Sequence, residues 1–513
     1  MRAAAPSVSD RVLALPLFLL MCGIASFAML IPAAFAGIID EHEVGRTFLY
    51  SGLLGLILFG LIALAHAGRA PGHGTLGPLM SLFSAFVFLP VMLAVPFYEG
   101  LRTTTFLNAY VEMVSAITTT GAPMFNPERL SAPLHLWRGL VGWLGGLLMW
   151  IAASAILAPL NLGGFEVTSR AEPGQATDQI RRFGRPEGRV RLMKVTVALV
   201  PIYAGLTLLL WVLLMALGDV PLTAVMHAMA VMATSGITPH DGIAQAGAGY
   251  AGEAVMVLFM LLALSRLTFS SDTVTKSAGS LGDDPEFRIG LALALLVPLV
   301  LFVRHWLGAY DVNAEDSLLE AAQALWGSVF TVVSFLTTTG FQSASWQTAQ
   351  DWSGLATPGL ILMGLALIGG GVATTAGGVK LLRVFALYQN GYREMERLVY
   401  PSSVSGAGGL SARVQRDGAF IAWIFFMLFA LSLAGITMLL ALLGLPFEAA
   451  IKLAVAALTT TGPILEVTDT VSVRLAEMGS WAKGVFAAAM VLGRLETLAI
   501  IALLTPDLWR AGR

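Results

Sequence analysis

A short polar phrase, Thr-Thr-Thr-Gly, interrupts apolar sequence at 118–121, 337–340 and 459–462, and a looser copy, Ala-Thr-Ser-Gly, stands at 233–236. A bare cation that crosses lipid must lose its water, and backbone carbonyls that point at one axis can replace that hydration. Glycine accepts the unusual backbone angles that such a loop requires. We therefore predict a cation filter built of carbonyls from extended phrases, with the threonine hydroxyls bonded to neighbouring groups. The predicted filter residues are Thr118, Thr119, Thr120, Gly121, Thr234, Ser235, Gly236, Thr337, Thr338, Thr339, Gly340, Thr459, Thr460, Thr461 and Gly462.

The spacing of the four phrases indicates an internal duplication. Their glycines are separated by 115, 104 and 122 residues, a period that corresponds to a domain-sized unit repeated four times. Each unit contains a long apolar helix, a shorter apolar segment that ends in the phrase, and a second long helix. These three parts are predicted at 77–98, 106–121 and 134–160; at 192–217, 222–236 and 252–270; at 288–308, 318–340 and 356–388; and at 418–444, 447–462 and 481–505.

The short segment before each phrase carries the functional prediction. NAYVEMVSAI, LTAVMHAMAVM and AAIKLAVAAL are too short to span a membrane, because a spanning helix needs about 20 apolar residues. They are predicted to be re-entrant half-helices, since irregular backbone at membrane depth is tolerated only beside protein or a water-filled cavity. The alternative is a set of interfacial helices with ordinary Thr/Gly caps.

The composition places the chain in a membrane. It has 513 residues, of which 57% are hydrophobic and 12% charged, whereas soluble proteins carry about 25% charged residues. The uncharged runs at 195–218 and 420–444 are each long enough to span the hydrocarbon core. The single cysteine, Cys22, excludes intrachain disulfides and argues against metal or haem sites that need cysteine ligands. We expect no covalently bound cofactor, no transition metal and no nucleic-acid partner.

The basic residues predict the orientation. They are concentrated at 166–194 and 380–416, whereas 237–252 and 306–325 contain no lysine or arginine. Both termini are therefore expected in the cytoplasm, with the half-helices entering from outside. The apolar run at 12–36 is predicted to be a retained transmembrane helix, because a signal-peptide core has only about 7–15 apolar residues; a signal peptide is the alternative.

These elements predict an all-α polytopic membrane protein with about ten spans. Four repeats of helix, pore loop and helix surround a central pore and follow two N-terminal helices. The predicted boundaries are 1–75 for the N-terminal pair, 76–165 for the first repeat, 166–285 for the second with its basic cytoplasmic loop, 286–400 for the third with a gating loop, and 401–513 for the fourth.

Four phrases in this context resemble those of the Trk/Ktr/HKT superfamily of potassium-uptake membrane subunits. The stretches at 137–160, 369–383 and 493–510 are similar to its bacterial TrkH-type branch. The resemblance implies a potassium pore within one inner-membrane subunit, a homodimer, and a cytosolic ring of nucleotide-binding RCK-type subunits. The intact Gly121 favours potassium, because sodium-preferring plant relatives carry a serine at the first filter glycine. A sodium or mixed sodium/potassium carrier, channel-like or coupled flow, and a membrane-embedded enzyme are the alternatives.

Two features outside the filter are candidates for a gate. The run GGGVATTAGG at 369–378 is predicted to unwind a helix below the filter, although small residues also permit tight helix packing. Arg494 stands in the apolar run near the C-terminus, where a charge at membrane depth is costly. It either raises a barrier to cations, extends its charged end to the membrane surface, or forms a buried ion pair. The predicted gating residues are Gly369, Gly370, Gly371, Thr374, Thr375, Gly377, Gly378, Lys380 and Arg494.

Two polar residues in the half-helices leave more than one interpretation open. His227 is expected to pack or to contact a loop, with a proton relay as the alternative. Glu112 either holds the first filter loop by hydrogen bonds or enriches cations near the entrance. The glycine-rich run at 369–378 lacks the GxxxxGK[ST] pattern of a nucleotide-binding loop, so we expect no nucleotide there.

Overall fold

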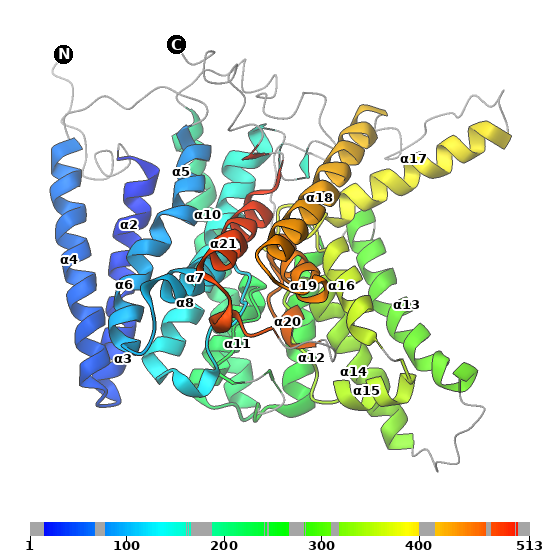
Figure 1. Ribbon diagram of the computed structural model, residues 1–513, viewed down its shortest axis with the longest axis horizontal. Helices are drawn as coiled ribbons and strands as arrows, with labels where there is room; N and C mark the ends of the chain where they lie inside the picture. Colours follow the sequence, from blue (N-terminus) through cyan, green and yellow to red (C-terminus); the bar gives the residue numbers. More distant parts are fainter. Residues whose placement is uncertain are drawn as a thin grey trace.

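The computed structural model describes residues 15–66, 77–160, 162, 164–165, 187–240, 242–243, 246–265, 282, 284–308, 318–355, 357–399, 416–467, 473–497 and 499–500. Within these ranges every regular element is a helix (Figure 1). The predicted all-α membrane fold of four repeats with a leading helix pair is therefore confirmed. The arginines at 170, 181, 182, 185 and 413, which contributed to the predicted orientation, lie outside the described residues.

The N-terminal pair consists of one span made of two helical segments and one span made of a single helix. Helices α2 (Leu17–Ala28) and α3 (Leu30–Ile38) together form the first span, and α4 (His42–His66) forms the second. Most of α4 is not covered by the rest of the protein, which is expected for an apolar helix that contacts lipid. In Figure 1 this helix lies at the outer edge of the molecule.

The helices of the four repeats follow in chain order. The first repeat contains α5 (Gly77–Val87), α6 (Leu89–Leu101), half-helix α7 (Phe106–Ile117) and α8 (Ala132–Ala152). The second contains α10 (Glu187–Ala216), half-helix α11 (Pro221–Ala233) and α12 (Gly249–Met260). The third contains α13 (Pro285–Gly308), half-helix α14 (Leu318–Leu336), α15 (Trp346–Ser353), α16 (Pro358–Ile368) and α17 (Leu381–Val399). The fourth contains α18 (Arg416–Leu442), half-helix α19 (Phe447–Leu458), α20 (Ile464–Val467) and α21 (Ser480–Leu495).

About ten full spans are predicted for the whole chain, and the described residues contain eight helices long and apolar enough to cross a membrane, or nine with a bent pair. The second long helices account for the difference, because three of them are shorter than predicted. Helix α12 and its 3-10 continuation end at Leu264, α16 ends at Ile368, and α21 ends at Leu495. Half-helix α14 is counted among the eight although it is predicted to be re-entrant, because its 19 residues are long and apolar enough to cross a membrane.

The half-helices form the centre of the molecule. Each packs against helices of its own repeat, and α7, α11 and α14 also pack against the second helix of the preceding repeat, which is α21, α8 and α12 respectively. The contact between α7 of the first repeat and α21 of the fourth closes the ring. In α7 all residues from Val111 to Ile117 are buried, and Figure 1 shows α7 and α19 between the outer helices α4 and α13. An interfacial helix would expose one polar face, so this burial favours the re-entrant interpretation.

Candidate selectivity filter and gate

All four half-helices end in the same hydrogen-bonded turn. The N–H of the third phrase residue bonds to the carbonyl five residues earlier, at 2.9 Å in every repeat: Thr120 to Ser115, Ser235 to Ala230, Thr339 to Ser334, and Thr461 to Ala456. The N–H of the second residue bonds to the carbonyl three residues earlier, at 2.9–3.3 Å. This pair of bonds defines the Schellman motif, which satisfies carbonyls at a helix end. The four phrases therefore begin from one common geometry.

The second residue of each phrase has a left-handed backbone, with φ between 48° and 59° at Thr119, Thr234, Thr338 and Thr460. The expectation of fully extended phrases is wrong at this position, because the Schellman turn requires a left-handed residue after the helix. Glycine is the usual choice there, and a side chain costs about 1–2 kcal/mol. A threonine retained in all four copies indicates that its side chain has a use, since strained backbone concentrates at functional sites.

The threonine hydroxyls divide into two groups. The first threonine of three phrases donates to the carbonyl four residues earlier: Thr118 to Val114, Thr337 to Val333, and Thr459 to Val455, at 2.7–2.9 Å. These bonds agree with the predicted role of the hydroxyls. In the second group, the left-handed position, the buried hydroxyls of Thr119, Thr234 and Thr460 have no hydrogen-bond partner among the described residues. Thr338 is the exception at this position, because its hydroxyl accepts a hydrogen bond from the N–H of Gly377 at 2.8 Å.

The four glycines bring the phrases together in chain order. A Cβ atom on Gly121 would meet the carbonyl of Ser235, and one on Gly236 would meet the carbonyl of Thr339. A Cβ atom on Gly340 would meet Pro463, and one on Gly462 would meet Ala122. Each repeat thus touches the next, and the fourth touches the first. The structure joins all four predicted filter segments in one closed ring.

Gly462 differs from the other three glycines. Gly121, Gly236 and Gly340 have φ between 64° and 85°, whereas Gly462 does not have a positive φ. Position 462 needs a glycine because the backbone of the first repeat lies too close for a side chain: the Gly462 N–H donates to the carbonyl of Thr120 at 2.6 Å, and a Cβ atom would meet Ala122. The sequence alone could not distinguish these two reasons for a glycine.

Buried acidic residues hold two filter loops. Glu112 accepts a hydrogen bond from the backbone N–H of Met124 at 2.9 Å and forms a buried ion pair with Arg138 of α8. The first interpretation of Glu112, as a residue that holds the loop, agrees with this geometry. Glu253 of α12 accepts bonds from Ser343 Oγ and from the N–H of Ala344, both at 2.8 Å. Sequence reasoning missed Glu253, although an acidic residue in an apolar helix was a usable signal.

The segment 369–378, which we call the gating loop, is not helical and lies against the filter. The N–H of Gly377 donates to Thr338 Oγ1 at 2.8 Å, and a Cβ atom on Gly377 would meet the carbonyl of Thr459. Thr375 Oγ1 lies 3.4 Å from the carbonyl of Met232, at the end of α11. The loop therefore contacts three of the four repeats.

The loop is also fixed at its two ends. The N–H groups of Val379 and Lys380 bond back to the carbonyls of Leu367 and Ile368 at 2.9 Å, so the loop closes on itself. Gly369 and Gly378 have φ of 74° and 80° and lie against one another. The buried Lys380 ammonium donates to the carbonyl of Ala376. Gly370, Gly371 and Thr374 lie in the same buried turn, in which Thr374 Oγ1 donates to the carbonyl of Gly371 at 2.7 Å.

The buried arginine of α21 contacts this loop directly. Arg494 Nη1 donates to the carbonyl of Thr375 at 2.6 Å, and the residue is only 3% exposed. Glu496, the nearest acidic residue in sequence, forms its ion pair with Arg383 at 2.5 Å. Within the part of the chain that the structure describes, two other guanidinium nitrogens of Arg494, Nε and Nη2, have no hydrogen-bond partner. This geometry does not support snorkelling, and it joins the two predicted gating features.

Three comparisons with known proteins agree on one family. The TrkH family model, described as cation transport protein, matches residues 91–508. The chain is 32% identical to the Trk system potassium uptake protein TrkI of Halomonas elongata, over 83% of this chain and 81% of that protein. It is 30% identical to the Trk system potassium uptake protein TrkH of Vibrio parahaemolyticus, over 79% of this chain and 80% of that protein.

Comparison of the fold with solved structures indicates the same family. The crystal structure of the potassium transporter TrkH from Vibrio parahaemolyticus superposes with a TM-score of 0.77 and 25% sequence identity, over 98% of this chain and 99% of that one. The family model covers the four filter phrases, the gating loop and the buried arginine. The chain belongs to the TrkH family of cation transport proteins.

Proposed function

We propose that this chain takes up potassium ions across the bacterial inner membrane through one pseudo-fourfold filter. The observation that carries this proposal is the closed ring of four equivalent Schellman turns. The filter glycine after each turn touches the next repeat in chain order, and the fourth touches the first. The relatives' names, which describe potassium uptake systems, support potassium as the substrate. Gly121, the first filter glycine, is intact and favours potassium over sodium. Transport, rather than catalysis, is the activity that we assign.

The experiment that tests this proposal is ion flux through the purified protein in liposomes. Uptake of potassium, rubidium, sodium and lithium is compared under an imposed voltage. We expect potassium and rubidium to permeate and sodium and lithium to be excluded. Equal or higher flux of sodium would replace the proposal with its sodium-carrier alternative. A second imposed gradient, of protons or of sodium, separates channel-like flow from coupled transport.

We assign the gate to the gating loop and Arg494. The loop contacts the filter at Thr338 and Thr459 and would occupy the conduction path as a steric plug. The guanidinium of Arg494 holds the loop at Thr375 and adds a positive charge near that path. Opening requires the loop to move, so breaking either contact is expected to raise the flux.

The proposal extends to partners, boundaries and orientation. We expect a homodimer in contact with membrane lipid, a cytosolic RCK-type nucleotide-binding ring, and both termini in the cytoplasm. The basic loops at 170–194 and 380–416 are candidate docking surfaces, although setting the topology is a sufficient reason for their charge. The boundaries near residues 75, 165, 285 and 400 follow the repeats and place no soluble domain between them.

A further inference from the structure

A buried ion pair joins the third repeat to the fourth. Arg383, in the first turn of α17, and Glu496, the residue after α21, form it at 2.5 Å, and their side chains are 0% and 6% exposed. The two residues are 113 positions apart in the sequence. A buried ion pair adds little net stability compared with apolar packing. Its position beside the gating loop therefore calls for another reason.

The arginine of this pair also holds the end of the gating loop. Arg383 Nη1 donates to the carbonyl of Val379 at 3.1 Å. The N–H of Val379 in turn donates to the carbonyl of Leu367 at 2.9 Å, which closes the loop. One guanidinium therefore binds both the residue that follows the gating loop and the carboxylate at the end of α21.

An aromatic ring of a third helix confines the same guanidinium. Cζ of Arg383 lies 3.5 Å from the ring centroid of Phe425 in α18, and Phe425 is buried. Helix α18 packs against both α17 and α21, and Figure 1 shows it between them. A cation on an aromatic face is attracted most strongly where water is excluded. The guanidinium is thus held by a carbonyl, a carboxylate and a ring at once.

An unusual backbone presents the carboxylate of the pair. Helix α21 ends at Leu495, and Glu496 has φ of 63° and ψ of 147°, angles that residues with a side chain rarely adopt. Such a conformation persists only where the surrounding structure holds it, and the pair with Arg383 is a contact that can do so. Arg494 lies in the last turn of the same helix. The point at which α21 ends therefore also determines where the Arg494 guanidinium lies.

The Glu496 carboxylate acts on further buried cations around the loop. It attracts Lys380 and Arg494 as well as its partner, whereas Lys380 is repelled by Arg383 and Arg494. On α13, Glu286 also attracts Lys380. Three buried cations thus lie close together at the gate, and the Glu496 carboxylate offsets the repulsion among all three.

Two separate contacts therefore join the gating loop to the end of α21. In the middle of the loop, the carbonyl of Thr375 accepts a hydrogen bond from Arg494 at 2.6 Å. At the end of the loop, Val379 is joined through Arg383 to Glu496. Withdrawal of the loop from the filter requires either that both contacts break or that the end of α21 moves with the loop.

We propose that Arg383 and Glu496 are positioning residues of the gate, and that their ion pair makes the gating loop and the end of α21 move as one unit when the pore opens. This proposal rests on the proposed function. Breaking the pair removes one of the two attachments of the loop to α21. It also removes the carboxylate that offsets the charge of Arg494, so the closed position of the loop is populated less.

The first test measures rubidium uptake into liposomes that lack any regulator. Arg383→Gln and Glu496→Gln should each raise the uptake about threefold to thirtyfold, the range for a residue that couples two moving parts. The ratio of rubidium to sodium uptake should not change, because the filter is untouched. The double variant should leak no more than the stronger single variant, since both substitutions break the same contact. Arg383→Lys keeps the positive charge and should leak less than Arg383→Gln.

The second test measures the coupling without any ion flux. Hydrogen exchange is followed in the peptides that contain residues 376–381 and 490–497. Glu496→Gln should raise exchange at the end of the loop, and Arg383→Gln should raise it at the end of α21, each by about threefold or more. A residue that only stabilises its own helix would not change the distant peptide.

Two further variants complete both tests. Phe425→Leu removes the aromatic ring and keeps both charges, so it should give smaller changes in the same direction, including where a glutamine variant does not fold. Arg474→Gln breaks the exposed pair of Arg474 with Glu477 in the same repeat. It is the matched control and should leave uptake and exchange at the level of the parent protein.

The outcomes separate this coupling from the transport proposal. Unchanged uptake in folded single variants, uptake increases that multiply in the double variant, or exchange that rises only beside each substitution would overturn the coupling. A parent protein that takes up no potassium contradicts the proposed function instead. In that case the exchange result still decides whether Arg383 and Glu496 join the loop to α21.

Discussion

Arg494 and Thr375 lie 119 positions apart in the sequence and are joined by a hydrogen bond of 2.6 Å from the guanidinium to the backbone carbonyl. The carbonyl belongs to the gating loop, and two residues later Gly377 contacts the third filter phrase. A buried arginine, a loop and the filter are thus consecutive parts of one contact chain. The contact of Arg494 with the loop and the contact of the loop with the filter can each be removed by a separate substitution.

Replacement of Arg494 by alanine should raise the leak of cations. It removes the contact with Thr375 and a positive charge near the proposed path. Two unit charges about 4 Å apart repel by roughly 4 kcal/mol at an effective dielectric near 20, and water in the path lowers that figure. We expect at least about a tenfold rise in rubidium uptake into liposomes that lack any regulator, with unchanged ion preference. A folded variant as closed as the parent would place the gate elsewhere.

Gly377→Ala should have a similar effect through a steric route. The added Cβ atom would meet the carbonyl of Thr459 and the hydroxyl of Thr460, so the loop must move away from the filter. Gly364→Ala in α16 is the matched control, because a Cβ atom there has open space. Rubidium uptake without a regulator should rise in the first variant and stay at the parent level in the second. The same uptake for both variants would argue against the loop as a plug.

Serine at any of the four filter glycines should weaken the preference for potassium over sodium. Gly121, Gly236 and Gly340 have a left-handed backbone, and Gly462 has no space for a side chain. A shift of one phrase therefore changes the ring that all four complete. Competition between rubidium and sodium in liposomes measures the effect, with Gly435→Ser in open space as control. An unchanged preference in all four variants would remove the filter assignment.

Two glutamates that pair with arginines should differ in their effect on stability. Glu112→Ala leaves Arg138 buried without its partner, and breaking a buried pair costs about 3–5 kcal/mol. Glu43→Ala breaks an exposed pair with Arg102, for which about 0–1 kcal/mol is expected. Thermal unfolding of the detergent-solubilised variants compares them. Glu112→Gln, which can still accept the N–H of Met124, should retain more of the potassium selectivity than Glu112→Ala.

Charge reversal in the first basic loop tests the docking proposal. A triple variant with glutamate at Arg181, Arg182 and Arg185 should bind an RCK-type regulatory subunit more weakly in a pull-down, because the attraction between opposite charges is lost. The equivalent reversal at Arg393 and Arg397 tests the second loop. Insertion and ion flux of the variants are measured as controls. Binding that persists after reversal of both loops would exclude them as the docking surface.

The sequence by itself determined the repeat and the environment of the chain. Long uncharged runs predicted spans because a lipid core admits few charges. The half-helices were predicted from their length, and the filter from four recurrences of Thr-Thr-Thr-Gly or a close variant. The unwinding at 369–378 was predicted from local glycine content, since glycine weakens helices. All of these properties depend on local composition and period, which a sequence states directly.

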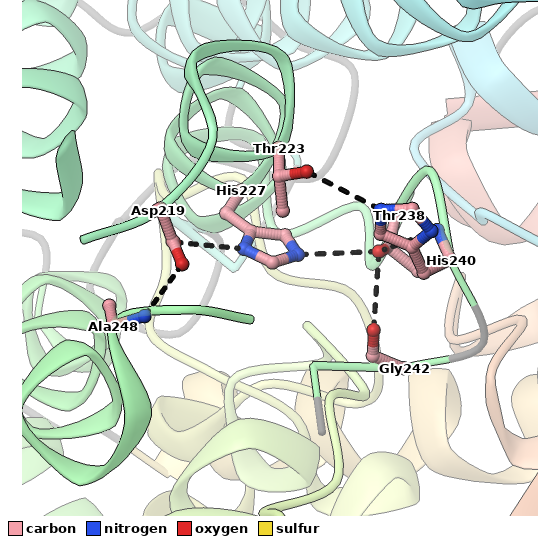
Figure 2. Close-up of polar contacts among 7 residues, drawn as sticks. All are labelled: Asp219, Thr223, His227, Thr238, His240, Gly242 and Ala248. Atoms are coloured by element: carbon pink, nitrogen blue, oxygen red, sulfur yellow. Dashed lines mark hydrogen bonds and ion pairs between the residues drawn. The ribbon is translucent and has the colours of Figure 1, made fainter. Parts of the chain in front are cut away.

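The tertiary structure decided how distant residues pair. The sequence placed Glu496 two residues from Arg494, yet Glu496 pairs with Arg383 and Arg494 contacts Thr375. His227 is one histidine among seven, and only the fold shows that its ring nitrogens face two residues close to it in sequence, Asp219 and Thr238 (Figure 2). The ring order of the glycines also emerged only there. Contacts between residues 100 or more positions apart depend on how helices pack, and no local pattern encodes that packing.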